Sequence, residues 1–165
     1  MGALPVEPTQ LDLRVPVTDS VDELDLSHPG RITLSVPADA VEGNWDADRV
    51  AQVVTNLVAN ALFHGGADTP IQIKLLDEGA DAAIRVTNQG PVIRSEDLPF
   101  LFDPFRKART GSQTGGLGLG LHIVFEVVKA HGGTVDVTSD AQHGTTFTAR
   151  FPKKPGRSGK PVASP

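Results

Sequence analysis

The sequence predicts an α+β two-layer sandwich, in which about five strands form one sheet and about three helices cover one of its faces. Apolar residues recur at helical spacing in three segments and alternate with polar residues in five others. The strands come in runs and do not alternate regularly with helices, which argues against a doubly wound fold. The 165 residues suffice for one domain with one core, which needs no disulfide bonds and can form none, because cysteine is absent.

The N-terminal part of the chain predicts a tail, a helix and a strand. Residues 1–10 are expected to form the tail. Apolar side chains recur at helical spacing within residues 11–26, and Pro16 should prevent this helix from starting much before it. Alternating apolar and polar residues at 31–36 predict a strand, which Pro37 ends.

A second helix is predicted to begin at an N-cap provided by Asp46 or Asp48 and to end at the Gly65–Gly66 pair. Its apolar residues fall three and four positions apart, which predicts one broad buried face. These residues are Val50, Val53, Val54, Leu57, Val58, Ala61 and Leu62.

A hairpin is predicted next, with strands at residues 71–75 and 83–86 joined by a polar turn. Two later stretches, 88–99 and 106–116, contain glycine, proline and polar residues without periodicity. Both are therefore predicted to be loops, and the second is a candidate lid.

The last part of the domain predicts a third helix at residues 117–131 and two strands at 134–139 and 145–151. Residues 153–165 are rich in Pro, Gly, Ser and Lys and are expected to form a disordered tail. The folded domain is therefore expected to span residues 11–152.

The charge and hydropathy of the chain exclude several classes of partner. With 15 basic and 20 acidic residues, the chain lacks the basic footprint of a nucleic-acid-binding protein. No apolar run approaches the roughly 20 residues of a membrane span, and the N-terminal residues do not have the pattern of a signal peptide. We expect a cytoplasmic segment that contacts neither nucleic acid nor membrane and that holds any anionic ligand locally.

Three side-chain amides lie on one face of the second helix. Gln52, Asn56 and Asn60 are spaced four residues apart, so they project from one face. Such a polar stripe suits a hydrated magnesium ion and phosphate oxygens. The alternative is that the amides are ordinary solvated surface residues.

A glycine-rich run, Gly115 to Gly120, leads directly into the third helix. Glycines at a helix start allow backbone N–H groups to approach an anion, and the helix dipole favours negative charge there. The run matches neither the dinucleotide-binding nor the Walker A spacing. The alternative is a flexible hinge that ends in a helix cap.

Two phenylalanines and three cations precede this run. Phe102 and Phe105 are interpreted as core anchors more readily than as ligand contacts. Arg106, Lys107 and Arg109 belong either to a solvated loop or to a mobile loop that could close over a triphosphate.

Six segments occur in the order found in the ATP-binding catalytic domain of sensor histidine kinases, a domain related to those of gyrase, Hsp90 and mismatch-repair ATPases. They resemble the asparagine box at Gln52–Ala61, the first glycine box at Val86–Ile93, the phenylalanine box at Leu101–Phe105, the second glycine box at Gly116–Val124 and the strand starts at His131–Gly133 and Gly144–Phe147. The resemblance covers residues 11–152. It implies a Bergerat-type fold, with a mixed, mostly antiparallel sheet faced by three helices.

The resemblance also implies a site for ATP and Mg²⁺ and transfer of the γ-phosphate to a histidine on a phosphoacceptor and dimerisation domain, with a response regulator downstream. Asn56 would be the metal ligand. The residues implied in catalysis are Gln52, Asn56, Asn60, Arg106 and Lys107. Those implied in nucleotide binding are Asn60, His64, Asn88, Gly90, Val92, Phe102, Phe105, Gly116, Leu117, Gly118, Leu119, Gly120 and Thr146.

Four positions depart from related proteins. Asn88 stands where the family has an aspartate that accepts the adenine amino group, and its amide oxygen can still accept that bond. Val92 replaces a glycine, and Phe63 replaces a cation that often reaches the phosphates. Gln52 stands where ATP-hydrolysing relatives carry a general-base glutamate, which favours a kinase over a fast ATPase.

The chain lacks a phosphoacceptor histidine in the usual context, in which Glu or Asp and then Leu-Arg follow the histidine. This applies to His28, His64, His122, His131 and His143. We therefore expect a catalytic part of a kinase that does not phosphorylate itself, and that is either excised from a longer protein, which we favour, or acts on another chain. The alternatives are a stand-alone serine kinase similar to anti-sigma factors and a scaffold that has lost nucleotide binding.

Overall fold

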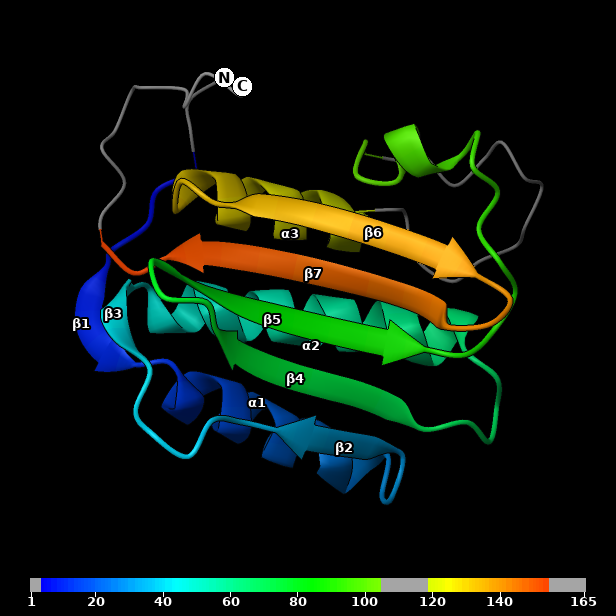
Figure 1. Ribbon diagram of the computed structural model, residues 1–165, viewed down its shortest axis with the longest axis horizontal. Helices are drawn as coiled ribbons and strands as arrows, with labels where there is room; N and C mark the ends of the chain where they lie inside the picture. Colours follow the sequence, from blue (N-terminus) through cyan, green and yellow to red (C-terminus); the bar gives the residue numbers. More distant parts are fainter. Residues whose placement is uncertain (1–3, 105–118, 155–165) are drawn as a thin grey trace.

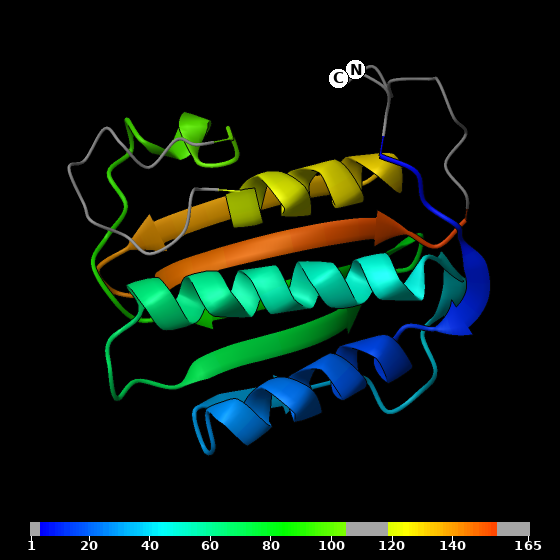
Figure 2. The same cartoon turned by 180° about the vertical axis from the view of Figure 1, so that it is seen from behind.

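The computed structural model describes residues 4–104 and 119–154. One layer is a five-stranded sheet, and three helices lie side by side on one face of it (Figures 1 and 2). The predicted two-layer α+β class is therefore confirmed. None of the helices in the described residues is long and apolar enough to cross a membrane.

The strand order in the sheet is β2-β4-β5-β7-β6. The strands are β2 (Ile32–Ser35), β4 (Ile71–Asp77), β5 (Asp81–Asn88), β6 (Thr134–Asp140) and β7 (Gly144–Pro152). β2 pairs with β4 in parallel, and the other neighbours are antiparallel. All five strands were predicted, and the sheet is mixed and mostly antiparallel as expected.

The helices are α1 (Arg14–Ser27), α2 (Ala47–His64) and α3 (Leu119–Ala130). Pro16 is the third residue of α1, where its missing N–H needs no partner within the helix. Asp46 is the N-cap of α2, because its Oδ1 accepts the backbone N–H of Arg49 at 3.2 Å. α2 ends at His64, directly before the predicted glycine pair. A short 3₁₀ turn, Leu98–Phe100, begins within the predicted loop of residues 88–99 and ends one residue after it.

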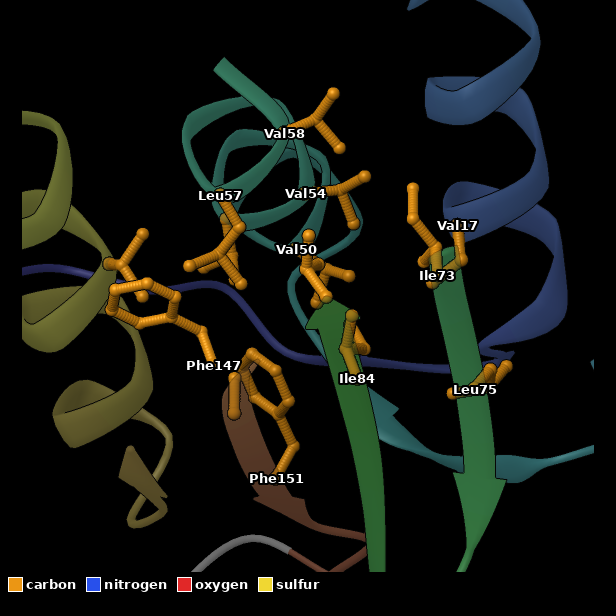
Figure 3. Close-up of a cluster of buried hydrophobic side chains, with 14 of the residues drawn as sticks. Val17, Val50, Val54, Leu57, Val58, Ile73, Leu75, Ile84, Phe147 and Phe151 are labelled. Carbon is orange, nitrogen blue, oxygen red and sulfur yellow. The ribbon is translucent and has the colours of Figure 1, made fainter. Parts of the chain in front are cut away.

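The core lies between the helices and the sheet, with α2 at its centre (Figure 3). Val54 and Leu57 of α2 meet Ile84 of β5 and the rings of Phe147 and Phe151 of β7. All five side chains are buried, and burying each one contributes roughly 1.5–3 kcal/mol. The even-numbered residues of β5 and the odd-numbered residues of β7 therefore face the helices.

A second, two-stranded sheet was not predicted. β1 (Thr9–Asp12) pairs antiparallel with β3 (Glu42–Trp45) at the end of the molecule where α2 begins (Figure 1). Gly43 is required in β3, because a β-carbon there would overlap the buried ring of Trp45. Ordered pairing thus starts at Thr9, two residues inside the expected N-terminal tail.

Candidate functional site

Four elements that are distant in the sequence meet at the other end of the sheet, on the right in Figure 1. These are the C-terminal half of α2, the end of β5, the start of β7 and the start of α3. The backbone N–H of Gly66 donates to the carbonyl oxygen of Gln89 at 2.7 Å, which ties the end of α2 to the end of β5. Asn88 and Thr145 are register partners, so the start of β7 lies beside this junction.

Asn56 has unused hydrogen-bonding capacity at the centre of this region. Its Nδ2 is buried and has no hydrogen-bond partner among the described residues. A β-carbon on Gly120 would lie 3.7 Å from Asn56 Oδ1, so the start of α3 packs directly on the Asn56 amide. The structure thereby brings together two predicted site residues from different motifs. A buried unsatisfied amide costs about 1–3 kcal/mol, which a ligand can relieve.

The other two amides of the stripe differ in their surroundings. Gln52 Oε1 accepts a hydrogen bond from Arg49 Nη1 at 3.1 Å, so the Gln52 carbonyl is held within the protein. Asn60 is half-buried one turn after Asn56, on the same face. Arg49 was missed from the sequence, although its position three residues before Gln52 places it on this face.

Asn88 ends β5 on the face of the sheet that carries the helices. The residue is 3% exposed, and its side-chain amide has no hydrogen-bond partner among the described residues but is not one of their fully buried, unpartnered groups. Gly65 packs beside it, since a β-carbon on Gly65 would lie 3.4 Å from Asn88 Cβ. A β-carbon on Gly90 would overlap the carbonyl oxygen of His64. The glycines therefore allow the backbone after β5 to pass close to the end of α2.

His64 and Phe63 lie at the rim of this junction. Their rings make an edge contact, with centroids 5.0 Å apart. His64 is exposed as a residue, but the partial desolvation of its ring lowers its pKa below the ordinary 6.5. At neutral pH its ring is a hydrogen-bonding group without charge. Val92, in the loop after Gly90, is also exposed.

The structure corrects the assignment of Thr146. Its Oγ1 lies 2.9 Å from Thr87 Oγ1, on the face of the sheet opposite the helices. Phe147 and Phe151 occupy the core, so the alternation of β7 turns Thr145 toward the site and Thr146 away from it. This alternation was visible in the sequence. We therefore replace Thr146 with Thr145 in the candidate site.

Thr145 is part of a hydrogen-bonded group that sequence reasoning missed. Its Oγ1 lies 2.7 Å from Ser139 Oγ, and the Ser139 oxygen accepts the backbone N–H of Ile93 at 2.9 Å. These bonds join β6 and β7 to the loop that follows Gly90. The group therefore holds that loop against the sheet beside Asn88.

Phe102 belongs to an aromatic cluster. Its ring stacks on Phe125 with centroids 6.2 Å apart and makes an edge contact with Phe147 at 6.0 Å. His122 Nδ1 lies 3.0 Å from the Phe102 carbonyl oxygen. These contacts support the interpretation of Phe102 as a core anchor and place it beside α3.

Several predicted site residues cannot be placed in the same way. Leu119 is the first residue of α3 and is half-buried. The others lie outside the described residues, namely Phe105, Arg106, Lys107, Arg109, Gly116, Leu117 and Gly118. Within residues 4–104 and 119–154, no group of three or more His, Cys, Asp or Glu side chains could hold a metal ion.

Comparison with known proteins agrees with this geometry. The family described as histidine kinase-, DNA gyrase B- and HSP90-like ATPases matches residues 45–155, which include α2, the ends of β5 and β7, and α3. The chain belongs to this family. The segments that meet in the structure all come from the matched residues.

Relatives of the ATPase-family domain are larger proteins. The chain is 32% identical over 159 residues to a bacteriophytochrome of Pseudomonas aeruginosa, and 35% identical over 151 residues to the probable sensor histidine kinase TcrY of Mycobacterium tuberculosis. These matches cover 94% and 90% of this chain, but 22% and 32% of the two relatives. The chain thus spans less than a third of each.

A solved structure shows the same domain by itself. The catalytic domain of the histidine kinase ThkA superposes with a TM-score of 0.78 at 26% identity, covering 91% of this chain and 98% of that one. The resemblance to a histidine kinase catalytic domain is therefore confirmed at the level of both sequence and fold.

Proposed function

We propose that this domain binds ATP with Mg²⁺ and donates the γ-phosphate to a histidine on a separate phosphoacceptor and dimerisation domain. The observation that carries the proposal is the buried, unpartnered Nδ2 of Asn56 beside Gly120 at the start of α3. A phosphate oxygen between α2 and α3 would supply the missing acceptor. The 12-residue α3 would add the favourable potential of its N-terminus for an anion.

The base of the nucleotide would lie toward the C-terminal end of α2, against Asn88. Asn56 lies eight positions before His64, the last residue of α2, a rise of about 12 Å, and the next residue, Gly65, packs beside Asn88. The path from Asn88 past His64 and Asn60 to Asn56 and Gly120 thus suits an extended nucleotide. The neutral ring of His64 can form a hydrogen bond along this path.

The amides suit a magnesium ion that is shared with phosphates. Mg²⁺ prefers oxygen ligands, keeps several of its waters and commonly binds through few protein groups together with substrate phosphates. Asn56 Oδ1 would hold the ion, and Asn60 would contact the phosphates or the water shell of the ion. When bound, Mg²⁺ would neutralise charge on the phosphates. Asn56, Asn60 and the start of α3 would position the triphosphate for transfer.

Gln52 supports phosphotransfer over rapid hydrolysis. A neutral amide cannot take a proton from water at pH 7, and its carbonyl oxygen already accepts a hydrogen bond from Arg49. Phosphotransfer needs mainly positioning and charge neutralisation, which amides, backbone donors and a metal can provide. Arg106 and Lys107 remain proposed contributors to charge neutralisation.

The acceptor histidine is proposed to lie outside this chain. His131 is buried and held by two hydrogen bonds, and His122 and His143 are engaged by the Phe102 carbonyl and by Asp140. Two-component signalling through a response regulator follows from this proposal, with the domain in the cytoplasm. We propose domain limits of 11–152, extended at the start to include β1 from Thr9.

Calorimetry with Mg²⁺ and a non-hydrolysable ATP analogue tests nucleotide binding, using the chain itself. We expect saturable heat for the unaltered chain and for Thr55→Ala, an exposed position on α2 beside Asn56. We expect weaker binding for Asn60→Ala. No heat at millimolar nucleotide would contradict the proposal and leave only the scaffold alternative.

Phosphotransfer in trans tests the second half of the proposal. Radiolabelled ATP and the phosphoacceptor domain of the parent kinase should yield acid-labile phosphohistidine with the unaltered chain and little with Asn60→Ala. Transfer to serine on a captured partner would support the anti-sigma-like alternative. Equal transfer by both variants would contradict the role of Asn60.

A further inference from the structure

Asn88 is a buried amide whose orientation no neighbour determines. The residue is only 3% exposed, and its backbone is held by pairing with Thr145. No hydrogen bond from another described residue reaches its side-chain oxygen or nitrogen. These two atoms are not among the fully buried, unpartnered atoms of the described residues, which are Trp45 Nε1 and Asn56 Nδ2, so the tip of the amide is accessible from the site. The position of this side chain is therefore fixed, while the rotation of its terminal amide is free.

The surroundings of Asn88 suit a neutral heterocycle better than a phosphate. Gly65 and Thr145 lie beside Asn88, and Gly144 lies against the backbone carbonyl oxygen of Asn88. None of these residues carries a charge. The helix N-terminus that favours an anion lies with Asn56, about 12 Å before the C-terminal end of α2. The uncharged surroundings of Asn88 can therefore hold the edge of a purine, not the phosphates.

A free amide can recognise two kinds of purine, which a carboxylate cannot do at the same atom. The oxygen of Asn88 can accept a hydrogen bond from a 6-amino group. Rotation of the amide by about 180° presents its NH₂ group, which can donate to a 6-oxo group. A carboxylate offers only acceptors and would oppose the oxygen of a 6-oxo purine.

We propose that Asn88 makes the base site tolerant of position 6, so that the domain binds 6-oxo purine nucleoside triphosphates as well as ATP. The inference rests on the proposed function, because it requires a nucleotide bound between Asn56 and Asn88. Asn88 is thus a specificity-determining residue of that site. No partner in the described residues fixes whether the oxygen or the nitrogen of the Asn88 amide faces the ligand, and this observation carries the proposal.

Competition binding with ATP and inosine triphosphate tests this directly, with a fluorescent nucleotide as the displaced probe. Inosine triphosphate carries a 6-oxo group but no 2-amino group, so it reports on position 6 without an added substituent. We expect its dissociation constant to lie within about tenfold of that for ATP. In Asn88→Asp, inosine triphosphate should weaken by roughly tenfold or more relative to ATP.

Two further variants keep the test decisive. Thr87→Val alters the neighbouring residue on the opposite face of the sheet, and its affinity ratio for the two nucleotides should match the unaltered chain. If Asn88→Asp does not fold, Asn88→Leu removes donor and acceptor together and should weaken both nucleotides by similar factors.

The outcomes separate this inference from the function on which it rests. If the unaltered chain binds ATP but binds inosine triphosphate more than a hundredfold more weakly, the inference is overturned and the proposed function stands. An unchanged ratio in a folded Asn88→Asp variant would overturn it as well. Absence of binding for both nucleotides would overturn the proposed function, and the inference with it.

Discussion

The two ends of α2 differ in how their polar groups are satisfied. At the N-terminal end, Asp46 Oδ1 accepts the N–H of Arg49, its Oδ2 accepts the N–H of Glu7 at 2.9 Å, and its own N–H donates to His131 Nε2 at 3.1 Å. The second ring nitrogen of His131 donates to the Val127 carbonyl at 2.8 Å. This end thus joins α2, α3 and the segment before β1 through bonds within the protein.

At the C-terminal half of α2, the polar groups are left open. Asn56 Nδ2 is buried without a partner among the described residues, and the Asn88 side chain forms no hydrogen bond with them. Asn56 Nδ2 thus leaves a donor that a ligand can use in this half of α2, at a cost in stability. Trp45 Nε1, beside the N-cap, is the other buried side-chain atom without a partner among the described residues, so the contrast is between the Asp46 carboxylate and the Asn56 amide. The capping carboxylate stabilises the fold, whereas the Asn56 amide stays available for binding.

The largest expected effect comes from removing the open amide. Asn56→Ala should lower phosphotransfer by roughly 10²–10³-fold, as loss of a positioned polar group commonly does. Its free energy of unfolding should stay the same or rise by about 1 kcal/mol, because a buried unsatisfied group is removed. Phosphotransfer assays and urea denaturation measure the two effects. A variant that loses both activity and stability would contradict the contrast between the Asp46 carboxylate and the Asn56 amide.

The next-largest effect is expected from disrupting the hydrogen bonds at the N-terminal end of α2. His131→Ala should lower the free energy of unfolding by about 2–4 kcal/mol, because it leaves the Asp46 N–H unpaired and removes a ring that packs on Phe151. The control is His143→Ala, an exposed position that should change stability by less than about 0.5 kcal/mol. Nucleotide affinity of the folded His131→Ala protein should remain within about threefold, as ΔΔG values of distant sites are independent.

A smaller effect is expected at the cap. Asp46→Ala removes the acceptor for the N–H groups of Arg49 and Glu7 and should cost about 1–2 kcal/mol of stability. Asp46→Asn retains an acceptor for the Arg49 N–H but places an NH₂ group opposite the Glu7 N–H, so it should recover only part of the loss. Thermal unfolding distinguishes the two variants, and equal losses would show that the cap hydrogen bond to Arg49 contributes little here.

The smallest effect is a pH dependence at the same end. Hydrogen bonds from the Arg14 guanidinium, supported by the backbone N–H groups of Val41 and Arg14, outweigh burial and hold the pKa of Asp12 below its ordinary 3.8. Because the pKa is lower in the folded state, Asp12 contributes stability that is present above about pH 4. That contribution is lost as the pH falls through the folded-state pKa.

Denaturation of the unaltered chain and of Asp12→Asn at several pH values measures this contribution. The stability difference between them should be constant from pH 7 to about pH 5 and should shrink below about pH 4. A difference that grows on acidification would reverse the sign of the assigned shift.

The sequence predicted the main sheet and the three helices because their signals are long and periodic. The seven apolar positions of α2 and the alternation of β7 belong to elements of 18 and 9 residues. β1 and β3 have only 4 residues each, and Gly43 weakens the strand pattern of β3. Their pairing also depends on contacts across about thirty residues of sequence, which local patterns do not encode.

The candidate site stays a prediction, although the sequence motifs named several residues that the fold brings together. The structure places Gly120 against Asn56, and it places Asn88, the last residue of β5, beside Gly65 at the C-cap of α2. The choice between Thr145 and Thr146 required the register of β7, in which Phe147 sets the inward face. The bond from Arg49 to Gln52 depends on rotamers, which sequence spacing does not determine.

The parallel pairing of β2 with β4 also bears on how the chain assembles. Short turns join β4 to β5 and β6 to β7, whereas β2 reaches β4 only after α2 and β3 have intervened along the chain (Figure 1). β2 is an edge strand of 4 residues that is paired on one side only. Closing a long connection must precede the gain from such pairing. We therefore expect the amides of β2 to exchange hydrogen faster than those of β5 and β7, because this edge joins the sheet last and leaves it first.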